Sequence, residues 1–320
     1  MTRSTAFFVN GGAGRHLCSI PAFETYEKEN PDDDFIIVCE GGMDMYKGHP
    51  TLHRRAYDNW HKGLFEEKIK DRNCVSTEPY RVWEYYNQKA SLAQAFDIQI
   101  NNKGVRNVTV PNVYLSTDET VTGMDVVHEV KEKTGKNKTI VFQPFGRGTQ
   151  PIGPSGKHLV DMGGRSFSQM DAIKIVKKLQ RKYSVIVMAE FPINWEEAGC
   201  TDKVAQPEGM PLRNWVGVIN AADGFLGCDS VGQHFSYMLK IPSVAVVGST
   251  FPENVSYDDN DYFQVLDLGG KRRRYDPIRL TFDEEIQRSH DGIMTMADKA
   301  LDEIIKELEL VMNKGAKNGK

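Results

Sequence analysis

The 320-residue sequence predicts an α/β fold with parallel sheets, built from two halves and ending in a long helix. Short apolar runs alternate with segments of helical periodicity, which is typical of parallel sheets with right-handed crossovers. Some of these runs are apolar at every position, as in Phe35 to Cys39, which indicates strands covered on both faces. A charged, glycine-containing stretch without an apolar face, Val130 to Lys138, is the predicted linker between the halves.

The first half is predicted to alternate strand and helix before it becomes irregular. We expect strands at residues 6–9 and 35–39, with a helix at 17–28 between them. Residues 41–72 are polar and aromatic without clear periodicity. A second helix is expected from about residue 81 to 96, followed by an extended segment at 107–115. The first predicted domain is residues 1–134.

The second half, residues 135–320, has the clearer pattern. We expect its strands at residues 139–142, 184–188, 225–228 and 244–247. One helix is expected at 212–221, and another after Ser168, whose spacing to Asp171 resembles a capping box. A long amphipathic helix is expected to begin near Thr281 and Glu284 and to continue to about Val311, with its apolar residues on one face.

The composition is that of a soluble globular protein, with 40% hydrophobic and 26% charged residues. The net charge of −4 excludes an overall basic field that would draw the whole molecule to nucleic acid or anionic lipid, although a local patch could still bind them. Five scattered cysteines without a CxxC pair indicate a reducing compartment. No run approaches the roughly 18 apolar residues of a membrane span. We therefore expect a cytoplasmic protein without integral membrane contact.

A glycine-rich stretch, NGGAG at residues 10–14, joins the first predicted strand to the first helix, as phosphate-binding turns do. It lacks the Gly-Lys-Ser/Thr of a Walker A loop and the third glycine of a dinucleotide fingerprint, so ATP or GTP hydrolysis is not expected. Two interpretations stay open. The stretch is either a tight turn without a ligand, or a loop for an anionic or hydroxyl-rich ligand, which Arg15 and His16 in the first helical turn favour.

A stronger signal lies in ADGFLGCDSVGQHFSYMLKIPSVAVVGSTFPENV, from Ala222 to Val255. Asp229 and Ser230 follow one predicted strand, and Thr250 follows the next, so they are expected at the edge where open α/β sheets bind ligands. Asp229 could accept hydrogen bonds from sugar hydroxyls, and the N–H groups that follow Ser230 could bind a diphosphate. The alternative is that these residues cap a helix and that His234 is structural.

This stretch resembles the donor-site region of the heptosyltransferase-like glycosyltransferases, glycosyltransferase family nine. The family pattern runs Asp-Ser/Thr-Gly-x-x-His, then an apolar helix, a proline before the next strand and a Gly-x-Thr turn. The sequence matches this pattern at Asp229, Ser230, His234, Pro242, Gly248 and Thr250. Val231 stands where the family has glycine, and Gly232 comes one place later. The resemblance implies the GT-B fold, in which two Rossmann-like domains face each other across the active-site cleft.

The resemblance is weaker elsewhere. Arg165 and Phe167 stand in place of a family Lys-x-Trp, and GRHLCSIPAF near the start is similar to the family's Gly-Asp-x-x-x-x-x-Pro opening. In the family this opening aspartate is associated with activating the acceptor hydroxyl, whereas this sequence has Arg15. If the transfer is an inverting displacement, another residue must take the acceptor's proton. The candidates are Glu40 and Asp44, then His16; the alternative for each is an exposed loop residue without a catalytic role.

The resemblance assigns the second domain to the nucleotide-sugar donor and the first to the acceptor. The predicted donor-binding residues are Asp229, Ser230, Val231, Gly232, Gln233, His234, Arg147, Arg165 and Thr250. Helix N–H groups and arginines would stabilise the leaving diphosphate. The sequence has no Asp-x-Asp motif or His-rich cluster, so we expect neither a metal site nor an obligatory cofactor beyond the nucleotide-sugar co-substrate. The predicted acceptor-binding residues are Gly12, Ala13, Gly14 and Arg15.

The acceptor and the class of protein each have alternatives. Heptosyltransferase-like enzymes commonly act on lipopolysaccharide core, whereas GT-B enzymes of bacteriophages glucosylate or otherwise glycosylate hydroxymethylcytosine in DNA. The basic runs at residues 53–55 and 271–274 could contact DNA phosphates. The sugar transferred is a hexose, heptose or pentose. The chain could instead be a catalytically inactive sugar- or nucleotide-binding module, which Arg15 would suit. An oxidoreductase or epimerase is disfavoured by the incomplete glycine fingerprint.

Overall fold

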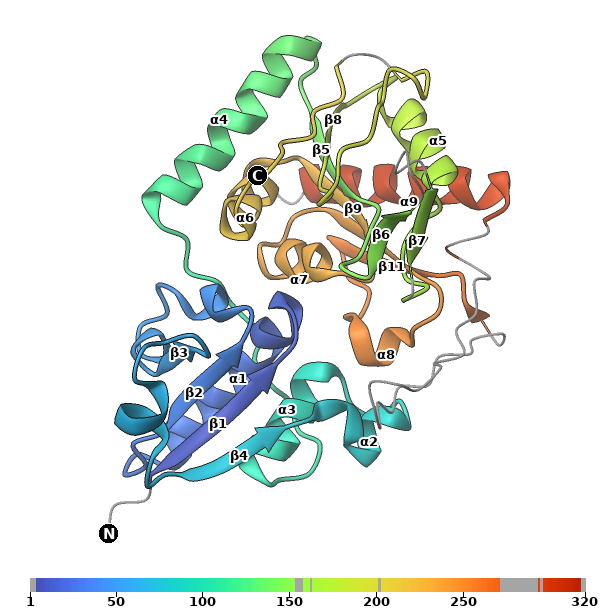
Figure 1. Ribbon diagram of the computed structural model, residues 1–320. Coiled ribbons are helices and arrows are strands. Elements are labelled where there is room, and N and C mark those ends of the chain that lie inside the picture. Colours follow the sequence, from blue (N-terminus) through green and yellow to red (C-terminus); the bar gives the residue numbers. More distant parts are fainter. Residues whose placement is uncertain are drawn as a thin grey trace. The chain divides into compact units, whose positions relative to one another are not determined.

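The computed structural model describes residues 4–152, 158–161, 163–200, 203–270, 293 and 296–317. They form two compact units, each with its own parallel sheet (Figure 1). The first unit contains residues 4–114, and the second contains the described residues from 115 onward. The predicted α/β class with parallel sheets is confirmed. The chain passes from one unit to the other after Tyr114, whereas the sequence predicted the boundary after residue 134.

The first unit has a four-stranded parallel sheet in the order β3-β2-β1-β4, with α1 behind it in the view of Figure 1. The strands are β1 Thr5–Asn10, β2 Ile36–Glu40, β3 Ala56–Asp58 and β4 Asn73–Thr77. The helices are α1 Ala13–Glu29, α2 Trp83–Tyr86 and α3 Leu92–Asn101, with 3-10 turns at Met43–Tyr46, Leu52–Arg54 and Pro79–Arg81 and a π-helical turn at Leu64–Ile69. The sequence missed β3 and β4, because both are edge strands with partly exposed side chains and no apolar run.

The prediction of one continuous helix over residues 81–96 is wrong, since this segment contains two separate helices, α2 and the start of α3. Ser91 ends the break with a full capping box: its hydroxyl accepts the N–H of Gln94, and the Gln94 side chain accepts the N–H of Ser91. Gln88 lies just before it with a φ of +55°, which a helix interior does not allow. Residues 107–115, predicted as extended, contain no strand.

Helix α4, Thr117–Thr134, occupies part of the predicted linker. It begins with a capping box between Ser116 and Glu119 and ends at Gly135, whose φ is +70°. It packs on α6, Leu212–Ala221, through Gly123 and Gly217, where a Cβ on Gly123 would lie 2.1 Å from the Gly217 carbonyl carbon. The sequence pattern missed this helix because the first half of its buried face consists of Glu119 and Gly123, and apolar residues are buried only from Val127 onward.

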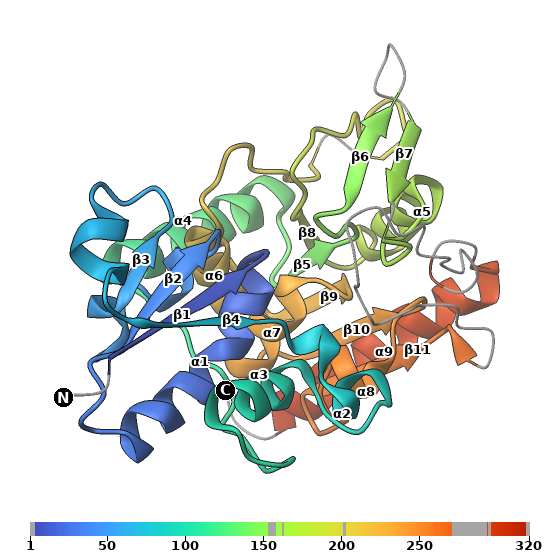
Figure 2. The ribbon, with the colours of Figure 1, turned by 60° about the horizontal axis from the view of Figure 1, so that its bottom comes forward.

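The second unit has a five-stranded parallel sheet in the order β11-β10-β9-β5-β8. Its strands are β5 Thr139–Gln143, β8 Ser184–Val187, β9 Gly224–Cys228, β10 Ser243–Val247 and β11 Phe263–Asp267. A separate antiparallel hairpin is formed by β6 Thr149–Ile152 and β7 His158–Asp161 (Figure 2). The remaining helices are α5 Gln169–Leu179, α7 Val231–Met238, α8 Pro252–Val255 and α9 Asp298–Lys317.

Most predicted elements of this unit are confirmed, including the Ser168 cap, whose hydroxyl accepts the N–H of Asp171. The C-terminal helix begins at Asp298, so Ile293 precedes it. The predicted cap at Thr281 and Glu284, like the basic run at 271–274, lies outside the described residues.

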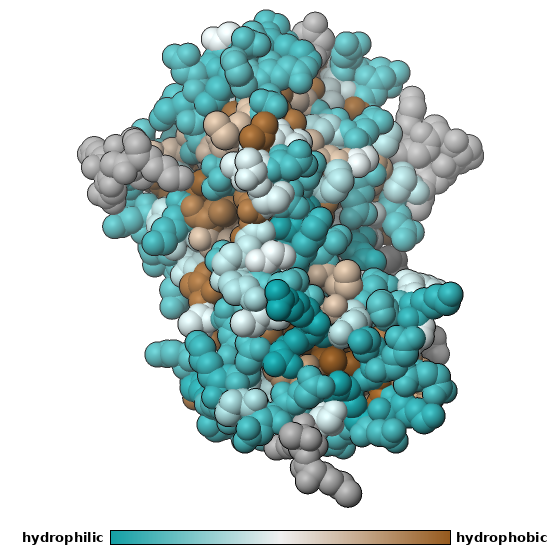
Figure 3. Space-filling model, turned by 90° about the vertical axis from the view of Figure 1, so that its left-hand side faces the viewer, coloured by the Kyte–Doolittle hydropathy of each residue, from teal (hydrophilic) through white to brown (hydrophobic). Residues whose placement is uncertain are grey.

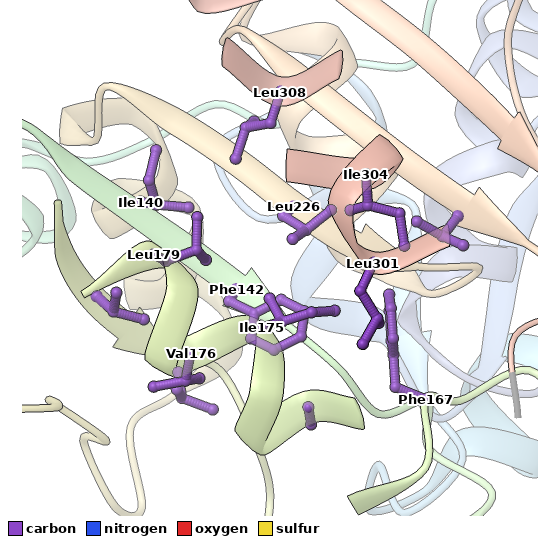
Figure 4. Close-up of a cluster of buried hydrophobic side chains, with 14 of the residues drawn as sticks. Ile140, Phe142, Phe167, Ile175, Val176, Leu179, Leu226, Leu301, Ile304 and Leu308 are labelled. Carbon is purple, nitrogen blue, oxygen red and sulfur yellow. The ribbon is translucent and has the colours of Figure 1, made fainter. Parts of the chain in front are cut away.

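The core of the second unit explains why its strands are apolar at every position. Alternate strand residues such as Ile140, Phe142 and Leu226 pack with α5 and α9 on one face of the sheet (Figure 4). Phe225, one position away, points to the other face and contacts α7 at Gly232. Full burial on both faces therefore requires apolar residues throughout. Three ion pairs also join α5 and its C-terminal turn to α9, namely Lys174 with Asp298, Lys178 with Asp302 and Lys182 with Glu309.

The face of the molecule drawn in Figure 3 is mainly hydrophilic. On the face drawn in Figure 3, hydrophobic residues form small separate groups among hydrophilic ones. The most exposed large hydrophobic side chains of the described residues include Trp60 and Phe65. None of the helices that the structure describes has both the length and the apolar character needed to cross a membrane.

Candidate functional site

Polar side chains meet where β9 and β10 end. The two strands are parallel neighbours, so Asp229 after β9 and Thr250 after β10 lie at the same edge of the sheet, as predicted. Both are buried, and Asp229 accepts a hydrogen bond from Thr250 Oγ1 over 2.9 Å. A second oxygen of Asp229 accepts one from Gln233 Nε2, also over 2.9 Å. The carboxylate is therefore held in a fixed orientation.

An arginine approaches this carboxylate from another loop. Arg165 Nη1 lies 3.8 Å from Asp229 Oδ2, and 29% of the Arg165 side chain is exposed. The structure thus brings together Arg165 and Asp229, two donor-site candidates that are distant in sequence. The other cation candidate, Arg147, is exposed in the loop after β5. Partial exposure leaves the Arg165 guanidinium accessible to an anion while Asp229 orients it.

Helix α7 begins directly beside this pair, with Ser230 as its N-cap and Val231 half-buried in its first turn. Gln143, the last residue of β5, forms two hydrogen bonds to the start of α7. Its Oε1 accepts the N–H of Gly232 over 2.9 Å, and its Nε2 donates to Ser230 Oγ over 3.2 Å. A Cβ on Gly232 would lie 2.4 Å from Gln143 Oε1, so only glycine fits there. This close approach explains why the sequence has a glycine at position 232, one place later than the glycine of the family pattern.

Gln143 was not predicted from the sequence. The signal that could have found it is its position as the polar residue that ends a central strand, the same reasoning that selected Asp229.

Gln233 and His234 face the interior of the second unit. Gln233 is fully buried, donates to the Val255 carbonyl as well as to Asp229, and accepts a hydrogen bond from Ser256. His234 Nδ1 lies 2.8 Å from the Tyr257 hydroxyl. Burial lowers the pKa of His234 to about 4, so its imidazole is neutral near pH 7. His234 therefore adds no positive charge for a diphosphate.

In the first unit, the loops after β1 and β2 lie against each other. A Cβ on Gly41 would lie 3.0 Å from the carbonyl oxygen of Gly11, and one on Gly42 would lie 2.6 Å from His16 Nδ1. Gly11, Gly41 and Gly42 all have positive φ values, as their turns require. The predicted acceptor-binding residues Gly12, Ala13 and Gly14 are partly exposed at the start of α1.

Arg15 packs the aliphatic part of its side chain against Gly11 of this loop, where a Cβ on Gly11 would lie 2.6 Å from Arg15 Cδ. Its guanidinium pairs with Glu78 over 3.5 Å and lies over the ring of Tyr80, 4.8 Å from the ring centre. Only 9% of Arg15 is exposed. The side chain thus ties α1 to the segment after β4, and its contacts are those of a structural residue.

The three candidate bases differ in accessibility. Glu40 at the end of β2 and Asp44 in the following 3-10 turn are exposed. His16 is fully buried, with Nδ1 3.2 Å from the Gly12 carbonyl oxygen. Only the two carboxylates are open to a substrate hydroxyl. No group of three or more potential metal-ligating side chains occurs within the described residues.

Several solved structures with a similar fold are glycosyltransferases. One, a family 9 glycosyl transferase from Veillonella parvula, has a TM-score of 0.62 at 11% identity, with 98% of each chain covered. ADP-heptose LPS heptosyltransferase II from E. coli has a TM-score of 0.56 at 12% identity, covering 98% of this chain and 99% of its own. This chain has their fold.

A third similar structure is an E. coli heptosyltransferase solved with ADP, with a TM-score of 0.54 at 12% identity; 95% of this chain and 99% of that one are covered. No family model and no curated protein matches the sequence. The resemblance predicted from the sequence is therefore confirmed at the level of the fold, GT-B, over nearly the whole chain.

Proposed function

We propose that the protein is a glycosyltransferase that moves a sugar from a nucleoside-diphosphate sugar to an acceptor hydroxyl, with the donor bound by the second unit. The observation that carries this proposal is the partly exposed Arg165, oriented by Asp229 beside the first turn of α7. The fold shared with heptosyltransferases over nearly the whole chain supports it.

The donor site would stabilise negative charge with groups that are already in place. The guanidinium of Arg165 can form paired hydrogen bonds to diphosphate oxygens. The N-terminal end of α7 adds its partial positive charge, which favours an anion. Because Thr250 and Gln233 hold Asp229, little reorganisation is needed when the leaving diphosphate gains charge.

In the inverting displacement that we propose, the acceptor oxygen bonds to the anomeric carbon as the bond from that carbon to the diphosphate oxygen breaks. The hydroxyl proton passes to a carboxylate, for which Glu40 and Asp44 are the exposed candidates in the first unit. The diphosphate leaves with the electron pair. We propose that no divalent ion is required, since Arg165 and the helix N-terminus supply the positive charge.

We propose a cell-envelope glycan as the acceptor, and the name of the LPS heptosyltransferase among the similar structures supports this class. DNA, the alternative, has weaker support. Arg55 in the basic triplet at residues 53–55 pairs with Glu27 over 2.9 Å and also contacts Asp34, so its charge is already engaged.

The test is a panel of nucleotide sugars with a core oligosaccharide or modified duplex DNA as acceptor. A transferase releases nucleoside diphosphate and labels one acceptor, with Arg165→Ala strongly impaired and the exposed Arg181→Ala unchanged. Binding without turnover would indicate an inactive module, and reduction of a nicotinamide would indicate an oxidoreductase. Transfer to DNA that weakens steeply with salt, with a slope of log affinity against log salt of about −0.9 per phosphate contact, would overturn the glycan acceptor.

A further inference from the structure

A buried carboxylate controls the loop that carries Arg165. Asp161, the last residue of β7, is 2% exposed. One of its oxygens accepts the N–H of Gly163 over 2.6 Å, and the other accepts those of Arg165 over 2.9 Å and Ser166 over 2.8 Å. Three backbone donors thus converge on one side chain. The carboxylate fixes the course of the backbone from residue 163 to 166.

Residues 163–166 form hydrogen bonds or an ion pair with the loops that follow β5, β9 and β10. Ser166 Oγ accepts the N–H of Gly146, in the loop after β5, over 2.9 Å. The carbonyl oxygen of Gly163 accepts a hydrogen bond from Ser249, after β10, over 3.2 Å. Arg165 itself reaches Asp229, after β9. Any shift of the segment would therefore move the guanidinium relative to the carboxyl ends of these strands.

The Asp161 carboxylate also packs against the backbone of Gly148. A Cβ on Gly148 would lie 2.9 Å from Asp161 Oδ1, so the carboxylate fills the space beside a residue without a side chain. An asparagine at 161 would keep the shape but offer only one acceptor oxygen, and its NH₂ group would face backbone donors. The charge of the group, and not only its size, is needed to satisfy the three N–H groups.

We propose that Asp161 is a positioning residue that sets the Arg165 guanidinium for the diphosphate of the donor. The proposal rests on the proposed function and adds a residue that contacts no substrate itself. Asp161 acts through Arg165: removing its charge leaves buried N–H groups without acceptors, and the segment relaxes away from the position that aims the guanidinium.

The test is a double-mutant cycle read by calorimetric binding of ADP, UDP, GDP and CDP. Asp161→Asn is expected to weaken binding of the preferred diphosphate about tenfold in the otherwise unchanged protein. In the Arg165→Ala background the same change is expected to have almost no further effect, because its route to the ligand is gone. Asp171→Asn, which alters another buried carboxylate of the second unit, is the control and should leave affinity unchanged.

Hydrogen exchange at the amides of Gly163, Arg165 and Ser166 gives a readout that does not depend on nucleotide, and it should accelerate in Asp161→Asn. Should Asp161→Asn not fold, Gly148→Ala displaces the carboxylate more gently and is expected to give the same two effects. Equal affinity losses in both backgrounds, or unchanged exchange, would overturn the positioning role alone. A wild-type protein that binds none of the four diphosphates would overturn the proposed function itself.

Discussion

Arg213 and Glu119 form a buried, two-pronged ion pair that joins α6 to α4. Arg213 Nε lies 2.5 Å from Glu119 Oε1, and Nη2 lies 2.8 Å from Oε2. Less than a tenth of either side chain is exposed. Glu119 also accepts the N–H of Ser116 in the capping box that starts α4. One carboxylate therefore both caps the start of α4 and attaches this helix to α6.

Glu119→Gln is expected to destabilise the second unit by about 3–5 kcal/mol, because it leaves the Arg213 charge buried without a counter-charge. The matched control is Glu129→Gln on the same helix, whose pair with Lys133 is exposed to solvent and is expected to contribute little to stability. Denaturant unfolding of both variants measures the difference. Similar losses for the two would contradict the role given to the buried pair.

The same pair predicts a loss of stability in acid. The Arg213 hydrogen bond lowers the pKa of Glu119 from 4.5 to about 2. As pH falls, the unfolded chain takes up this proton near pH 4.5, while the folded protein resists until about pH 2. The ion pair's contribution is thus present above pH 4.5 and is lost between pH 4.5 and 2. In Glu119→Gln this part of the pH dependence should vanish.

His234 predicts a separate pH window. Burial lowers its pKa from 6.5 to about 4, so on acidification the unfolded chain is protonated first. Stability should fall between pH 6.5 and 4, by at most about 3.5 kcal/mol, since one pKa unit corresponds to about 1.4 kcal/mol. In His234→Gln the melting temperature should depend less on pH over this range, whereas His128→Gln, at an exposed site, should keep the pH dependence of the unchanged protein. An equally steep profile in both would refute the assignment.

The packing of α4 on α6 predicts a sharp penalty at Gly123. Its added Cβ would lie 2.1 Å from the Gly217 carbonyl carbon, so Gly123→Ala must push the helices apart, at a cost on the order of 1–3 kcal/mol. Gly104→Ala, where a Cβ meets nothing within 4 Å, is the control. A thermal shift for Gly104→Ala as large as that for Gly123→Ala would show that the helices tolerate separation.

The sequence predicted the elements whose cause is local. β5, β9 and β10 are buried on both faces, and their continuous apolar runs made them predictable. The N-cap residue Ser168 indicated where α5 begins. Because the ends of β9 and β10 were predictable, so was the meeting of Asp229 and Thr250. The causes of α4 are not visible in a hydropathy pattern, since it is held by a glycine contact and a buried ion pair.

Side-chain direction depends on partners that are distant in sequence, and here prediction was weaker. Nothing near Arg15 indicates that its guanidinium turns inward to Glu78 and Tyr80. The neutral state of His234 depends on burial by a fold that brings Tyr257 against it. Asp161 resembles any charged residue at the end of a hairpin until the backbone donors around it are known.

For the acceptor base, we expect one of Glu40→Gln and Asp44→Asn to lower kcat by about 10²–10⁴-fold with little change in donor KM. Both carboxylates are exposed, so neither change should alter the melting temperature appreciably. Glu66→Gln, at an exposed carboxylate of the first unit outside the loop that follows β2, is the control. If both variants keep full kcat, the base lies elsewhere in the chain.

Independence from divalent ions is the last prediction. The diphosphate must lose a sugar while gaining charge, and that charge has to be met by cations or by backbone donors. We expect Arg165 and the N-terminal turn of α7 to meet it, so turnover should persist in excess chelator. The Arg165→Ala variant should then have a lower kcat, and added magnesium should raise this kcat, because the ion could replace part of the missing charge. A wild-type enzyme that stops in chelator and recovers with magnesium or manganese would contradict this assignment of the positive charge to Arg165 and α7.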